Sequence, residues 1–104
     1  MNDISHKGIG LVDDGIYGYE IKSNYSYFRY GYSPDANIFF IYNIGTPNPN
    51  DRGKGYAKEV IKYFFELVKQ KNGRVEVGSY TSSGEKYIKP IMHRFSQLYG
   101  VKLI

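Results

Sequence analysis

The sequence predicts one α+β domain, a mixed central sheet with helices in the second half of the chain. Three observations support this fold class: segments in the first half alternate large with small or polar residues, an amphipathic segment fills 55–71, and another apolar segment follows at 74–80. Alternation has the two-residue period of a strand, whereas apolar residues three and four apart have the period of a helix. A chain of 104 residues fits one compact domain with one core.

The first half is predicted to be β-structure. Residues 15–22 alternate, and Ser23-Asn24 is a turn signal before a second alternating segment at 25–30, so we expect two antiparallel neighbours. Residues 37–44 are apolar at nearly every position, which is typical of a strand covered on both faces. This run is therefore predicted as the central strand. The prolines and asparagines of 45–51 then impose a loop.

The second half is predicted as helix, strand and helix. Asn72-Gly73 ends the first helix as a left-handed stop, and the strand at 74–80 should run parallel to that at 37–44. Ser82 to Glu85 fits a capping box for the second helix, and Gly100 ends it before a short terminal strand at 101–104. Pro90 either kinks this helix or marks its first turn. The apolar stripes of the two helices are Ala57, Val60, Ile61, Phe64, Leu67 and Val68, then Ile88, Ile91, Met92, Phe95, Leu98 and Tyr99.

Composition narrows the function classes. The absence of cysteine excludes disulfides, thiolate metal sites and a cysteine nucleophile, and no histidine or carboxylate cluster has metal-ligand spacing, so we expect no metal. The net charge of +4 favours an anionic partner, either a phosphorylated cofactor or a nucleic acid. Neither a membrane-length apolar run nor a signal-peptide pattern is present, so a soluble, cytoplasmic protein is expected.

A glycine-rich turn, Arg52-Gly53-Lys54-Gly55-Tyr56-Ala57, lies between an apolar strand and the strongest helix. A helix N-terminus presents unpaired N–H groups, and glycines let a phosphate approach the backbone closely. Arg52 and Lys54 would add positive charge at the rim. The Walker and dinucleotide-binding patterns are both absent. The turn therefore predicts a pyrophosphate site, the alternative being a solvated loop with glycines at a turn.

This turn resembles the Arg/Gln-x-x-Gly-x-Gly/Ala signature of the GCN5-related N-acetyltransferases (GNAT family), and Pro49 stands three residues before the arginine, as is common there. The order of elements from 37 to 104 is also similar to that family's core. Residues 1–14 leave little room for the family's opening strand and two helices, so the resemblance is to a minimal, truncated member with an acceptor site that is open or completed by a partner.

The resemblance implies that acetyl-CoA is the co-substrate and that an acceptor amine attacks its thioester directly. The acceptor would be a small amine or a protein lysine, as for some compact acetyltransferases of phages. Pantetheine would lie along Ile44, Gly45 and Thr46. The pyrophosphate would be held by Arg52, Gly53, Lys54, Gly55, Tyr56 and Ala57.

The catalytic residues are left unassigned. The family's glutamate base has no counterpart in 37–46, and the position of its tyrosine acid falls on Ser96, with Tyr87, Tyr99 and His93 as nearby alternatives. His6 is interpreted as a surface histidine.

Two other functions stay open. One is a noncatalytic acyl-CoA-binding or inhibitory module on the same fold. The other is a nucleic-acid-binding domain that stacks bases on the aromatic segment 25–32, although alternating aromatics more often form one face of a core with cross-strand pairs.

Overall fold

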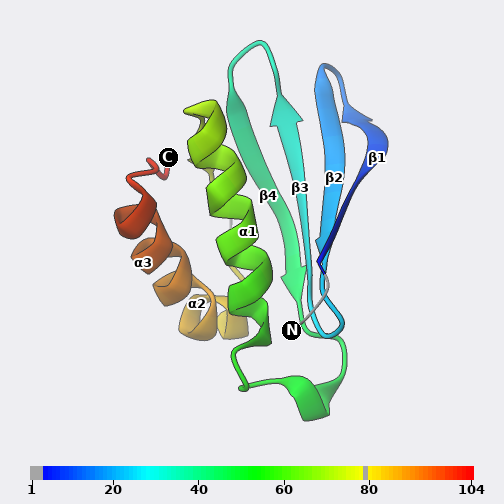
Figure 1. The fold of residues 1–104 in the computed structure, drawn as a ribbon, viewed down its shortest axis with the longest axis vertical. Helices are drawn as coiled ribbons and strands as arrows, with labels where there is room; N and C mark the ends of the chain where they lie inside the picture. Colours follow the sequence, from blue (N-terminus) through cyan, green and yellow to red (C-terminus); the bar gives the residue numbers. More distant parts are fainter. Residues whose placement is uncertain (1–3, 79) are drawn as a thin grey trace.

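The computed structural model describes residues 4–78 and 80–104, which form a mixed five-stranded sheet covered by helices (Figure 1). The strand order is β1-β2-β3-β4-β5, with antiparallel pairing from β1 to β4 and a parallel β4–β5 pair. The predicted α+β fold is therefore confirmed. The elements are β1 (Ser5–Asp13), β2 (Ile16–Lys22), β3 (Tyr27–Ser33), β4 (Ile38–Gly45), a 3-10 turn η1 (Pro49–Asp51), α1 (Tyr56–Lys71), β5 (Arg74–Glu76), α2 (Ser82–Tyr87) and α3 (Lys89–Tyr99).

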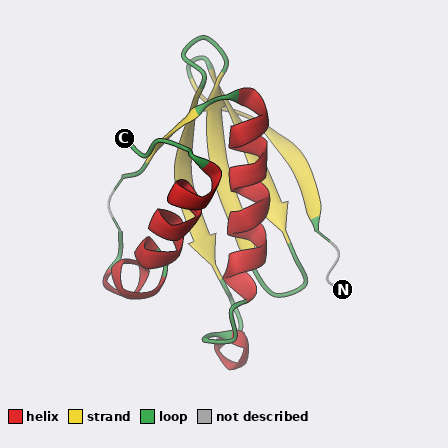
Figure 2. Cartoon of the chain, turned by 60° about the vertical axis from the view of Figure 1, so that its left-hand side comes forward, coloured by secondary structure: helices red, strands yellow, loops and turns green. Residues whose placement is uncertain are grey.

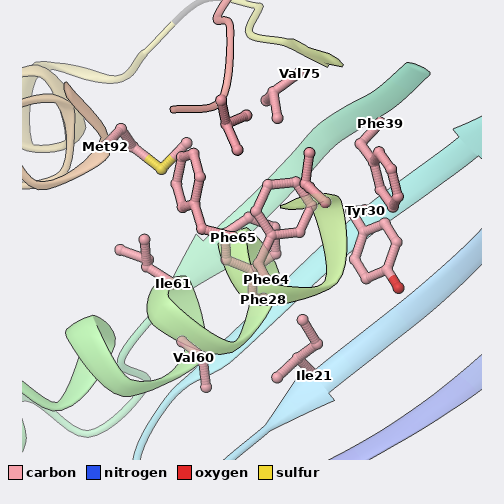
Figure 3. Packing of buried hydrophobic residues seen from close by; sticks show 12 residues of the cluster. Ile21, Phe28, Tyr30, Phe39, Val60, Ile61, Phe64, Phe65, Val75 and Met92 are labelled. Carbon is pink, nitrogen blue, oxygen red and sulfur yellow. The ribbon is translucent and has the colours of Figure 1, made fainter. Parts of the chain in front are cut away.

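The core lies between α1 and one face of the sheet. α1 forms at the predicted place because its apolar residues recur at helical spacing. Most of this stripe is fully buried, and its members Ala57 and Leu67 are partly buried. Phe64 stacks on Phe28 of β3 with ring centroids 4.3 Å apart, and Met92 of α3 closes the core on the other side of the helix (Figure 3). Each such buried side chain contributes about 1.5–3 kcal/mol relative to an exposed one. The buried members are Ile21, Phe28, Tyr30, Phe39, Val60, Ile61, Phe64, Phe65, Val68, Val75, Met92 and Val101.

The prediction that residues 37–44 form a doubly covered central strand is wrong in two respects. β3 occupies the middle of the sheet, and β4 lies next to the β5 edge. In addition, Tyr42 of β4 is 50% exposed. The physical reason is that α1 and α3 both lie in front of the sheet in Figure 2 and contact each other, so only one face of β4 is covered.

A strand that was not predicted, β1, pairs with β2 at the edge of the sheet. The signal for it was Asp14-Gly15, a two-residue hairpin turn in which Gly15 has a φ of +69°. β1 was not predicted because all nine of its residues are exposed, so its sequence has no apolar alternation that marks a core-facing side. The described elements before β4 are all strands.

Several predicted boundaries shift. The strand expected at 25–30 begins at Tyr27, because Ser23 to Ser26 form a hydrogen-bonded turn. The strand expected at 74–80 pairs only from Arg74 to Glu76, and Ser79 lies outside the described residues. The terminal strand at 101–104 is reduced to one parallel bridge, between Leu103 and Val75.

The predicted second helix is divided into α2 and α3 at Ile88. Pro90 stands in the first turn of α3, which settles the alternative left open above. The N-cap of α2 is Thr81 rather than Ser82, because the Thr81 hydroxyl accepts a hydrogen bond from the Gly84 N–H at 3.1 Å. Gly100 ends α3 in the left-handed conformation, as predicted.

Candidate functional site

The last half of β4 has a free edge. β4 pairs with β5 only from Ile38 to Phe40, so within the described residues 41–45 have no β5 partner. On the β3 side, Arg29 pairs with Asn43 but Tyr30 pairs with Ile41, which leaves an extra residue in β4 as a bulge. Unpaired N–H and C=O groups on such an edge are able to bind an extended, amide-containing ligand.

The loop after β4 reaches the N-terminus of α1 through two glycines in the left-handed conformation. Gly53 has a φ of +79° and Gly55, the N-cap, a φ of +82°. A Cβ built on Gly53 would meet nothing within 4 Å, and one on Gly55 only the Lys58 Cδ at 3.9 Å. No side chain of the described residues caps this end of α1. The loop thus offers free N–H groups and the positive end of the helix dipole to an incoming anion.

A cleft of about 850 Å³ joins the free edge to this loop. Its volume is within the range of ligand sites. Of the nine residues predicted to bind the cofactor, Lys54 is the one that does not line the cleft; its side chain is exposed. The far wall comes from α2 and the start of α3, a contribution the sequence did not reveal. The lining residues among those predicted are Ile44, Gly45, Thr46, Arg52, Gly53, Gly55, Tyr56 and Ala57.

Arg52 holds the loop against the end of β4. Its Nε donates to the Thr46 carbonyl at 2.9 Å, and its Nη2 donates to the Pro47 carbonyl at 3.4 Å. The Arg52 guanidinium therefore fixes the loop to the end of β4 in addition to carrying a positive charge. A second cation, Lys58, also lines the cleft.

Among the candidate proton donors, Tyr87 of α2 lines the cleft and is 60% exposed. The other three lie outside the cleft lining. The Tyr99 hydroxyl donates to Glu66 Oε1 at 3.4 Å, and burial together with this carboxylate raises the pKa of Tyr99. The Ser96 hydroxyl is used by the C-terminus of α3, donating to the Val101 carbonyl at 2.6 Å. His93 is exposed.

Tyr27 is a cleft residue that was interpreted only as part of the aromatic hairpin. Its ring lies against Gly45, where a Cβ would come within 2.7 Å of the Tyr27 hydroxyl oxygen. The Arg29 guanidinium lies 4.7 Å from the centre of this ring and donates to Glu20 Oε2 at 2.9 Å, a bond that lowers the pKa of Glu20. This packing places the Tyr27 ring at the mouth of the cleft.

The aromatic segment does not form one continuous stacking surface. Tyr30 is only 3% exposed and packs in the core, on the face opposite Tyr27, and its hydroxyl hydrogen-bonds to His6 Nε2 at 2.6 Å. His6 itself is exposed. Tyr30 of β3 thus packs in the core, while Tyr27 of the same strand lines the cleft.

The described part of the chain contains no grouping of three or more His, Cys, Asp or Glu side chains that could hold a metal ion. None of its helices combines the length and apolar character needed to cross a membrane.

Comparisons with known proteins give one informative result. Neither the scan against protein-family models nor the search of curated proteins found a match. Among solved structures, the chain is similar to a Bacillus subtilis acetyltransferase in complex with CoA, with a TM-score of 0.54 and 13% sequence identity over 94% of this chain and 76% of that one. At this identity the likeness concerns the fold alone: the chain has an α+β fold similar to that of this acetyltransferase.

Proposed function

We propose that this chain binds acetyl-CoA in the cleft between β4 and α2 and transfers the acetyl group to an amine. The observation that carries the proposal is the pair of left-handed glycines, open to the cleft, before the uncapped N-terminus of α1. The CoA-bound acetyltransferase of similar fold supports the choice of ligand.

The residues present fit such a ligand. Gly53 and Gly55, together with the first N–H groups of α1, would hold the diphosphate, because no Cβ obstructs its approach. The Lys58 side chain would add charge from inside the cleft. The backbone of Ile44, Gly45 and Thr46 would receive the pantetheine amides along the free edge of β4.

In the proposed reaction the acceptor amine attacks the thioester carbonyl, a C–N bond forms, the C–S bond breaks, and the amine loses a proton. The enzyme mainly orients the two reactants and supplies a proton to the departing thiolate. The Tyr87 hydroxyl is the group of the predicted set that can reach the cleft, so it is the proposed donor. The acceptor is proposed to be a protein lysine or a small amine, and the compartment the cytoplasm.

Binding is tested by calorimetric titration of CoA and acetyl-CoA into the wild-type protein, Gly55→Val and Tyr17→Ala. Gly55→Val should weaken binding at least about tenfold, because a branched side chain fills the space before the helix. Tyr17 lies outside the cleft lining, so Tyr17→Ala is the matched control and should bind like the wild type. Absence of CoA binding by the folded wild-type protein would refute the proposal.

Transfer is tested by release of free thiol from acetyl-CoA with panels of protein and amine acceptors. Tyr87→Phe should retain binding and lower kcat by about 10²-fold, the usual contribution of a positioned proton donor.

The second candidate, a noncatalytic acyl-CoA-binding module, is favoured by one observation. Within the described part of the chain, Asp51, near the glycine loop, is the one carboxylate that lines the cleft. Tight binding with no thiol release from any acceptor would support this candidate.

A further inference from the structure

The turn between β2 and β3 contacts both ends of the glycine loop. At one end, the Ser26 hydroxyl is hydrogen-bonded to the Thr46 hydroxyl at 2.7 Å, just after β4. At the other end, the Tyr25 ring stacks on the ring of Tyr56, the first residue of α1, with centroids 3.9 Å apart and planes inclined by 15°. A single short segment is therefore joined to the point where the loop begins and to the point where it ends.

This turn is itself tightly built. The Ser23 N–H donates to the Ser26 carbonyl at 2.9 Å, and the Ser23 hydroxyl oxygen accepts from the N–H groups of Ser26 at 3.0 Å and Tyr25 at 3.3 Å. Ser23 is 6% exposed and Ser26 2%. Such local side-chain hydrogen bonds fix the backbone of a turn. The two contacts with the loop thus start from a rigid support.

The loop needs such support. It contains the two glycines, which have the greatest conformational freedom of any residue, and most of it is exposed. If the loop were free to move, ordering it would reduce the affinity for a ligand, whereas a loop fixed in advance avoids that loss.

We propose that the β2–β3 turn is a positioning element for the cofactor loop, acting through Tyr25 on α1 and through Ser26 on β4. This inference rests on the proposed function, since the loop it positions is the proposed acetyl-CoA site. Neither Tyr25 nor Ser26 lines the cleft, so a substitution of either acts on the loop without removing a contact residue. The sequence alone predicted only that this turn joins two strands.

The first test needs no ligand. Backbone 15N order parameters of Gly53 to Ala57 are compared in the wild type, Tyr25→Ala, Tyr25→Phe and the control Tyr17→Ala. We expect them to fall from about 0.85 toward 0.6 in Tyr25→Ala. Tyr25→Phe retains the stacked ring and should restore them, and Tyr17→Ala should leave them unchanged. Wild-type order parameters in Tyr25→Ala would overturn the proposal.

The second test measures CoA affinity by titration. Tyr25→Ala should weaken it about two- to tenfold, the range that corresponds to a lost aromatic pair, with Phe again restoring it. In turnover, KM for acetyl-CoA should rise while kcat at saturation stays unchanged. Ser26→Ala should have a similar effect, because it removes the hydrogen bond to Thr46. This variant replaces Tyr25→Ala in the test if Tyr25→Ala does not fold.

The failures of the two proposals can be told apart. A wild-type protein that does not bind CoA refutes the proposed function, and the ligand-free order parameters still decide whether the turn holds the loop. A wild-type protein that binds CoA, with unchanged affinity and order parameters in both Tyr25→Ala and Ser26→Ala, refutes the positioning role alone.

Discussion

The backbone hydrogen-bonding groups at the two ends of helix α1 are satisfied in different ways. At the C-terminus, Asn72 adopts the left-handed conformation, its N–H donates to the Lys69 carbonyl at 3.1 Å, and the Gly73 N–H donates to the Val68 carbonyl at 3.0 Å. The Asn37 side-chain amide adds hydrogen bonds to the Lys71 and Asn72 carbonyls, at 2.9 and 3.3 Å. The chain's own groups therefore satisfy this end.

At the N-terminus of α1 the protein supplies fewer hydrogen-bond partners. The Lys58 N–H donates to the Gly55 carbonyl at 3.1 Å, and no side chain of the described residues caps the first turn. The glycines also differ between the ends. A Cβ on Gly73 would lie 2.7 Å from the Phe39 ring, whereas one on Gly55 would meet only the Lys58 Cδ, at 3.9 Å.

Because of this difference, substitutions at the two ends of α1 should affect different properties, stability at one end and ligand affinity at the other. Helix ends leave polar groups that must be satisfied by side chains, by water or by a ligand. At the C-terminal end the fold satisfies them, so substitutions there should cost stability. At the N-terminal end water or a ligand must satisfy them, so substitutions there should change affinity first.

The largest expected effect is on stability, from Gly73→Ala. The added Cβ would meet the Phe39 ring at 2.7 and 3.0 Å and the Asn37 carbonyl at 3.3 Å, and Phe39 is buried in the core. Overpacking of this kind destabilises by about 1–3 kcal/mol. Urea denaturation should show the loss. Gly78→Ala is the matched control, because a Cβ there meets nothing within 4 Å; equal stability of the two variants would contradict the contrast.

A smaller loss of stability is expected from Asn37→Ala. This change removes the two hydrogen bonds to the end of α1 and the acceptor of the Tyr32 hydroxyl, and it places alanine at a φ of +53°. We expect a cost of about 1–2 kcal/mol. Asn37→Gly relieves the backbone strain and removes the same bonds, so thermal melts of the two variants separate these causes. CoA affinity should be unchanged in both.

Helix α1 and the glycine turn could be predicted because their signals are local. The apolar spacing from Ala57 to Val68 defines the helix without reference to the rest of the chain, and eight residues chosen from the turn and the preceding strand meet in one cleft. β1 was missed because a strand with both faces exposed carries no apolar alternation, although Asp14-Gly15 marks its hairpin.

The remainder of the site depends on distant contacts. Tyr27 of β3 and Tyr87 of α2 meet in the cleft beside the part of β4 that has no β5 partner, and the sequence does not show where a parallel pair stops. The role of Tyr25 depends on its ring meeting Tyr56, far along the chain. The exposure of one face of β4 likewise follows from the placement of α3, which the helical stripe alone does not specify.

At the open end of α1, Gly55→Asn and Gly55→Asp form a nearly isosteric pair that isolates charge. Both side chains tolerate the left-handed conformation better than other residues do. The carboxylate should favour the helix dipole and repel the diphosphate, so Asp should bind CoA about fivefold more weakly than Asn at low salt while being at least as stable. Titration at two ionic strengths checks this. Equal affinities would mean that no anion binds at this helix end.

The smallest effect concerns pH and the packing beside the middle of α1. The His6 ring contacts the rings of Tyr19, Tyr30 and Tyr63, and the last of these belongs to α1. Burial raises the pKa of Tyr30, so its hydroxyl stays protonated, and it is hydrogen-bonded to His6 Nε2 at 2.6 Å. Burial also lowers the pKa of His6 below its ordinary value near 6.5.

The neutral form of His6 is therefore favoured in the folded state, and the unfolded chain takes up the proton more readily. This contribution to stability is fully present above about pH 6.5 and is lost as the pH falls through the lowered folded-state pKa. The loss should be small, because solvent screens a largely exposed ring. His6→Gln can still accept from Tyr30 but does not titrate, so the difference in unfolding free energy between pH 7.5 and 5 should shrink in this variant. CoA affinity of the folded protein should change equally with pH in both proteins. An unaltered pH dependence of stability in His6→Gln would show that other groups control the acid response, and a difference in affinity would show that the packing around His6 is coupled to the cleft.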